Sequence, residues 1–240
     1  MKIVKFYATT VAIFVTALLL ASVPLMAQQL RGNGNIKTEN RNVSGFEGIN
    51  VSGGFNVEVT QGNDEGVRLE AEENLLGNIK TEVRNGVLHI YNDKSLSTNK
   101  GMKAYITVKE LRSIEISGGV KVAGNSTFKT NKFDLEMSGG SNVKLALDTK
   151  QLTADMSGAS KVDLTGQADE VNMDMSGASK VEAEDLVAKR VKIQASGASK
   201  VKVYAKDALN INASGASSVY YKGSPTVNTD VSAAARVSKL

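Results

Sequence analysis

The central and C-terminal parts of the chain alternate apolar and polar residues in short runs. Leu152, Ala154 and Met156 alternate with polar residues, and Val162 and Leu164 do so again after a Ser-Gly-Ala step. A period of two over short runs is typical of half-buried β-strands and not of helices. The pattern therefore predicts pairs of short strands that flank a tight turn.

The Ser-Gly-Gly or Ser-Gly-Ala step recurs at nearly constant intervals. It begins at Ser52, Ser117, Ser138, Ser157, Ser176, Ser196 and Ser214, with a degraded copy at Ser232. From Ser117 to Ser232 the intervals are 21, 19, 19, 20, 18 and 18 residues. A unit of this length cannot bury its own apolar face, so neighbouring units must stack about 4.8 Å apart. The repeat predicts an all-β fold, a β-solenoid with coils of about 18–21 residues.

Aligning the repeats predicts two core columns. They are the residue before each serine (Val51, Ile116, Met137, Met156, Met175, Ala195, Ala213, Val231) and the fifth residue after it (Val57, Val122, Val143, Val162, Val181, Val201, Val219, Val237). The glycine after each serine indicates a corner with positive φ or a close approach of two chains. The serine itself is expected to hydrogen-bond locally at that corner.

Two polar columns are expected to point outward. Two residues before each serine lies an acidic ladder, which we define as Glu115, Glu136, Asp155 and Asp174. Four residues after each serine lies a basic ladder, defined as Lys121, Lys161, Lys180, Lys200 and Arg236. The acidic ladder is a candidate Ca²⁺ site or a source of raised-pKa acids for glycoside chemistry. The basic ladder is a candidate site for a glycan or another surface polyanion; the alternative for both is a solvated face.

The part before residue 117 is less regular. Asn85-Gly86 between two apolar-rich runs predicts a β-hairpin. We interpret residues 43–240 as a single solenoid domain, with irregular coils over 43–116 and regular repeats over 117–240. Residues 28–42 are expected to form an N-terminal linker.

Residues 1–27 have the pattern of a signal peptide. Lys2 and Lys5 precede a nearly continuous apolar run from Phe6 to Val23, and Ala27 is a small residue suited to cleavage. The predicted location is therefore the periplasm, the outer surface or the extracellular space. The alternative is an uncleaved segment, which would be the chain's only contact with a membrane.

Composition narrows the chemistry. The 240 residues are 41% apolar and 22% charged, with no Cys, no Trp and a single His. Disulfides, zinc–thiolate sites and cysteine nucleophiles are thereby excluded. Removal of Lys2 and Lys5 would leave 27 basic against 25 acidic residues, a charge of +2. That charge gives no reason to expect nucleic acid as a partner, and nothing in the chain predicts a cofactor.

No catalytic residue is predicted. The single histidine, His89, lies in an alternating run and is expected at an exposed or edge position of a strand. The serines have no second histidine to form a triad. The polar columns repeat smoothly, whereas a catalytic site would break the repeat at one place. A polysaccharide lyase or hydrolase remains an alternative, as does a structural or sensor partner in the cell envelope.

The run from Phe46 to Val59, with the triplet Gly48-Ile49-Asn50, resembles the opening of the head GIN domain, the auto-transporter adhesin domain of Bacteroidetes. Asn74-Leu75-Leu76, the run Val83 to Leu88 and the Ser-Gly-Ala-Ser repeats also fit that family, so the resemblance covers about residues 43–225. It implies a right-handed β-helix, a periplasmic or cell-surface setting and an adhesion role. It carries over no catalytic residues. The hypothesis is a non-enzymatic, exported adhesion or binding module of unknown oligomeric state.

Overall fold

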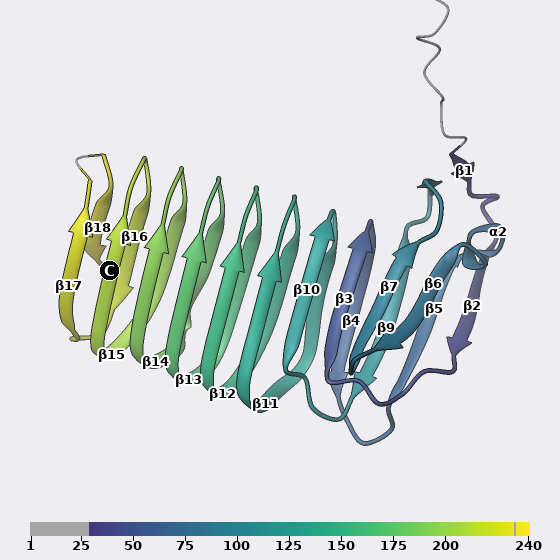
Figure 1. Ribbon diagram of the computed structural model, residues 1–240, viewed down its shortest axis with the longest axis horizontal. Coiled ribbons are helices and arrows are strands. Elements are labelled where there is room, and N and C mark those ends of the chain that lie inside the picture. Colours follow the sequence, from purple (N-terminus) through teal and green to yellow (C-terminus); the bar gives the residue numbers. More distant parts are fainter. Residues whose placement is uncertain (1–28, 233) are drawn as a thin grey trace, which may run out of the picture.

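The computed structural model describes residues 29–232 and 234–240, so the predicted signal peptide lies outside the described residues. The described chain is nearly all β and forms a β-solenoid of about 7 turns (Figure 1). Its one helix is the four-residue α2 (Glu73–Leu76). The all-β solenoid predicted from the repeat is confirmed.

The irregular N-terminal part contains ten strands. They are β1 (Leu30–Arg31), β2 (Ile36–Arg41), β3 (Gly48–Gly53), β4 (Phe55–Gln61), β5 (Gly66–Glu72), β6 (Ile79–Arg84), β7 (Val87–Asn92), β8 (Leu96–Ser97), β9 (Met102–Val108) and β10 (Ser113–Gly118). The regular part contains β11 (Lys121–Met137), β12 (Asn142–Met156), β13 (Lys161–Met175), β14 (Lys180–Ala195), β15 (Lys200–Ala213), β16 (Ser218–Lys222), β17 (Thr226–Val231) and β18 (Arg236–Lys239).

Each long strand bends near its middle and is followed by a Ser-Gly turn, so the two halves of a coil face each other (Figure 1). Successive coils pair in parallel and in register. Val143 of β12 pairs with Val162 of β13, and Leu152 pairs with Val171 in the second half of the same strands. The pairing repeats at the intervals of the sequence repeat, which places equivalent residues in straight columns along the solenoid.

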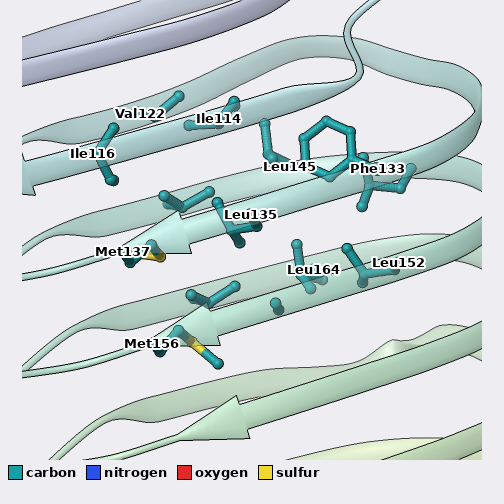
Figure 2. Packing of buried hydrophobic residues seen from close by; sticks show 14 of the residues in the cluster. Ile114, Ile116, Val122, Phe133, Leu135, Met137, Leu145, Leu152, Met156 and Leu164 are labelled. Atoms are coloured by element: carbon teal, nitrogen blue, oxygen red, sulfur yellow. The ribbon is translucent and has the colours of Figure 1, made fainter.

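The core lies between the facing halves of the coils. Side chains such as Leu145 and Leu164 from the first halves meet Leu152 and Phe133 from the second halves (Figure 2). The two predicted core columns are at most 4% exposed up to Val219. The predicted burial of these columns is wrong only in the last coil, where Val231 is 41% exposed and Val237 is half-buried. The last coil has a neighbouring coil on one side only, so its inward residues are not covered.

The Ser-Gly turns are close-packed against one another. Gly158 has φ +83°, and a Cβ built on it would lie 2.6 Å from the carbonyl oxygen of Gly139 in the preceding coil. The adjacent Ala159 N–H donates to that same oxygen at 2.9 Å. Both reasons proposed for the glycine column, positive φ and close approach, are therefore confirmed.

The serine column behaves partly as expected. Ser157 Oγ donates to the Met137 carbonyl at 3.4 Å. The buried serine is the one three residues later: Ser217, for example, is 0% exposed and its Oγ donates to the Ser214 carbonyl at 2.9 Å. This second serine closes the turn from inside, a role that the repeat pattern alone does not predict.

The predicted hairpin at Asn85-Gly86 is confirmed. β6 and β7 pair antiparallel with Arg84 opposite Val87, and Asn85 and Gly86 have φ +51° and +75°. The spatial order of the strands, however, differs from their order in the chain. β7 pairs with β3, and β9 pairs with β4, on the sides of β3 and β4 that face away from β10 and β11. Antiparallel β5 and β6 then join β9 and β7 at this end of the solenoid.

Candidate functional site

The basic ladder forms a straight outward row. Register pairs join Lys121, Asn142, Lys161, Lys180, Lys200, Ser218 and Arg236 in that order. Lys161, Lys180 and Lys200 therefore lie on adjacent strands about 4.8 Å apart. Asn142 and Ser218 separate this trio from Lys121 and Arg236. The registers confirm the alignment of the column, while ligand binding by it stays a prediction.

A second outward column runs beside the basic ladder. It contains Ala123, Lys144, Asp163, Glu182, Lys202, Tyr220 and Ser238. We call the two columns together the basic face; they contain seven basic and two acidic residues. Lys200 Nζ lies 5.4 Å from the centroid of the Tyr220 ring, within range of a cation–π interaction. The positive charge is thus broader than one row.

Glu182 partly neutralises the centre of the basic face. Its carboxylate lies 2.7 Å from Lys180 Nζ and 3.6 Å from Lys161 Nζ. The hydrogen bond from Lys180 holds the pKa of Glu182 below its usual range, so it is ionised at neutral pH. Because Lys180 and Glu182 are two residues apart on one strand, the sequence alone would have shown that they share a face.

The acidic ladder lies on the opposite face of the solenoid. Its four carboxylates are exposed and line a hollow of about 310 Å³ together with Ser138, Ser157 and Ser176. Asn50 Nδ2 donates to Glu115 at 2.6 Å at one end, and Gln194 Nε2 donates to Asp174 at 3.4 Å at the other. Within residues 29–232 and 234–240, no three His, Cys, Asp or Glu side chains form a group that could hold a metal ion. The calcium and glycoside hypotheses stay predictions.

His89 extends the acidic column at its N-terminal end. It lies half-buried on β7, in register with Asn50 of β3 and opposite Glu82 of β6. Asn50 separates it from Glu115 in the next strand. His89 lies on a strand as predicted, but the prediction of an exposed or edge position is wrong, because β7 pairs with both β3 and β6 and the side chain is half-buried.

The described chain thus belongs to a structural class: a β-solenoid whose stacked coils align equivalent residues in rows, with the basic ladder on one face and the acidic ladder on the opposite face. A family profile described as "Putative auto-transporter adhesin, head GIN domain" matches residues 45–225. Because this match covers well over half of the sequence, the chain belongs to that family.

Solved structures share the fold. A "putative adhesin" from Bacteroides fragilis is similar with a TM-score of 0.83 and 24% identity, over 88% of this chain and 100% of that chain. A "putative lipid binding protein" from Parabacteroides distasonis has a TM-score of 0.74 and 22% identity, over 89% and 100%. A "putative adhesin" from Parabacteroides merdae has a TM-score of 0.73 and 18% identity, over 88% and 99%. No curated protein matches the chain. In the part of the chain that the structure describes, no helix has the length and apolarity needed to span a membrane.

Proposed function

We propose that this protein is an exported, non-enzymatic adhesion module that holds linear polyanions, such as acidic polysaccharides or lipopolysaccharide phosphates, against its basic face. The observation that carries the proposal is the row of Lys161, Lys180 and Lys200 on adjacent strands. Cations about 4.8 Å apart match a polymer that carries repeated negative charges. The family and two of the solved relatives, all of which carry the description "putative" adhesin, support a role in attachment.

Affinity on such a face must come from many weak contacts. Lys161 and Lys180 side chains are 47% and 42% exposed, so each contact with an anion is screened by water and salt. A polymer that reaches several lysines at once binds more tightly than any single contact allows. Binding should therefore weaken as salt rises and strengthen with polymer length.

Glu182 makes the proposal testable in both directions. It competes with the ligand for Lys161 and Lys180, so Glu182→Gln should raise affinity for a polyanion. The triple variant Lys161→Gln, Lys180→Gln, Lys200→Gln should lower it. A matched control removes three exposed lysines from the N-terminal part, Lys37, Lys80 and Lys94, and should leave binding little changed.

The experiment measures binding of purified protein to polygalacturonate and to lipopolysaccharide, at low salt and at about 0.15 M salt. Weaker binding by the basic-face triple variant, normal binding by the control and tighter binding by Glu182→Gln would support the proposal. Equal binding by both triple variants, or no polyanion binding by the wild-type protein at low salt, would overturn it. Release of new sugar ends during the same incubation would favour the lyase or hydrolase alternative.

Export rests on the sequence of residues 1–27. The intact mass of the protein from its native host should correspond to a chain that lacks them. A mass that retains Lys2 and Lys5 would point instead to a membrane-anchored form.

A further inference from the structure

A polar hollow lies at the edge of the solenoid where each coil bends between its two halves, the lower edge in Figure 1. It has a volume of about 690 Å³ and extends across five coils, from Lys129 on β11 to Lys206 on β15. Its floor contains Thr130, Thr149 and Ala168, which pair in register. We call this hollow the edge groove. The Ser-Gly turns lie at the opposite edge, so the groove is separate from those turns.

The repeat is irregular in the coils that form the edge groove. The register between β14 and β15 shifts between Ala188 and Arg190, where β14 has one residue and β15 has two. Lys189 and Lys206, which lie at this shift, both line the groove. A site for a particular ligand requires such a break, because a uniform solenoid offers the same contacts at every coil.

The acidic side chains of the edge groove already have partners. Asp169 lies 2.7 Å from Lys189 Nζ, and Glu110 receives two hydrogen bonds from Arg112, of 2.9 and 3.1 Å. The hydrogen bond from Lys189 holds the pKa of Asp169 below its usual range, which keeps the carboxylate an acceptor at neutral pH.

Three lysines of the groove are still available. Lys129, Lys150 and Lys206, from β11, β12 and β15, form no ion pair in the described part of the chain, whereas Lys189 and Arg190 at the same edge do. The groove therefore contains three ammonium groups that are not held in an ion pair, spread over several coils.

We propose that the edge groove binds a short segment of an acidic oligosaccharide of the uronic acid class. Lys129, Lys150 and Lys206 would bind its carboxylates. Its hydroxyl groups need both donors and acceptors, which Gln167 and Asp148 supply; Gln167 Nε2 already donates to Asp148 at 2.9 Å. The volume lies in the range of about 300–1,000 Å³ that small-ligand sites occupy.

The chemistry of the lining argues against other ligands of this size. Ala168 and Val187 are the apolar residues of the lining, which contains no aromatic ring. A nucleobase or another planar apolar group would therefore have nothing to stack on. The site does not depend on the basic face, which would hold a polymer by charge alone.

The test is calorimetric titration with a short oligogalacturonate at about 0.15 M salt, where a purely charge-driven contact is largely screened. A neutral malto-oligosaccharide of equal length and inorganic phosphate are the comparison probes. Wild-type protein should bind the uronate in preference to both. The double variant Lys150→Gln, Lys206→Gln should bind it about tenfold more weakly or worse, as expected for loss of charge-assisted hydrogen bonds.

Two further variants distinguish this site from the basic face. The triple variant Lys161→Gln, Lys180→Gln, Lys200→Gln should keep its uronate affinity. Gln167→Ala should lose uronate affinity but keep salt-sensitive binding of long polyanions. Absence of uronate binding by the wild-type protein, or equal binding of phosphate, would overturn the inference. Normal uronate binding by the Lys150→Gln, Lys206→Gln variant would also overturn it, and so would equal losses of uronate binding in that variant and in the basic-face triple variant. If the basic-face triple variant alone loses uronate binding, this inference fails while the proposed function stands.

Discussion

Replacement of Gly158 by alanine tests the close packing of the Ser-Gly turns. Two costs add at this position. The backbone has φ +83°, a conformation that costs an L-residue about 1–2 kcal/mol. The new Cβ would also lie 2.6 Å from the Gly139 carbonyl oxygen, within a ladder of hydrogen-bonded backbone that can move little. Such overpacking typically costs about 1–3 kcal/mol, so the total loss of stability is about 3 kcal/mol.

That loss should be visible as a shift in melting temperature. For a chain of this size about 1 kcal/mol corresponds to a shift of 2–4 °C, so Gly158→Ala should melt roughly 6–12 °C below the wild type. Circular dichroism at a strand wavelength during heating measures the shift.

Gly140 is the matched control. It occupies the same turn position as Ala159 one coil later, and a Cβ built on it meets nothing within 4 Å. Gly140→Ala should therefore be neutral or stabilising by up to about 1 kcal/mol. If Gly158→Ala has the melting temperature of the wild type, or if both variants are destabilised equally, then the positive φ and the carbonyl contact do not explain why a glycine is required at position 158.

Three further outcomes are expected. Ser217→Ala should lower the free energy of unfolding by about 1 kcal/mol in urea titrations, because it removes a buried 2.9 Å hydrogen bond; an unchanged midpoint would show that this hydroxyl does not stabilise the turn. Asn85→Ala should cost about 1 kcal/mol, measured in the same way, because Asn85 has φ +51°, and Asn85→Gly should cost less. Glu182 has a lowered pKa, so its contribution to stability is complete above its unfolded pKa of about 4.5 and is lost as pH falls through the lower folded value. The melting temperatures of wild type and Glu182→Gln should therefore differ at neutral pH and converge in acid, and a constant difference would contradict this reasoning.

The regular coils are predictable because each coil repeats the same contacts. A column such as Val143, Val162 and Val181 appears in the sequence as equivalent positions, and parallel in-register pairing converts it directly into a buried row. The positive φ of the glycine column follows from the same alignment. The hairpin at Asn85-Gly86 is predictable for a local reason, since its turn requires two residues that tolerate positive φ.

The order of strands in the N-terminal part has no comparable signal. β7 pairs with β3, and β9 with β4, across stretches of sequence that do not repeat. Pairing at a free edge requires only compatible strands, so period and composition do not identify the partner. Apart from the hairpin of β6 and β7, the antiparallel pairings at this end, those of β5 with β2 and β9, could therefore not be predicted.

The position of the candidate site can be predicted from the sequence, but the side-chain contacts around it cannot. The outward row of Lys161, Lys180 and Lys200 follows from the repeat, but its partial neutralisation by Glu182 depends on side-chain contacts between columns. The edge groove depends on where β14 and β15 fall out of register, between Ala188 and Arg190. Coil lengths can be read from the sequence, whereas the location of a one- or two-residue insertion within a coil is decided by packing.

The in-register stacking of the coils also affects how such a protein can evolve. One inserted copy of a unit such as residues 157–175 would bring its own turn glycine, buried serine, core residues and one more outward lysine. It would contact only its two neighbours, so the rest of the molecule need not adjust. Duplication or loss of a unit would thus lengthen or shorten the basic row in steps of about 4.8 Å. Relatives with different numbers of coils could therefore match ligands of different length without redesign of any single contact.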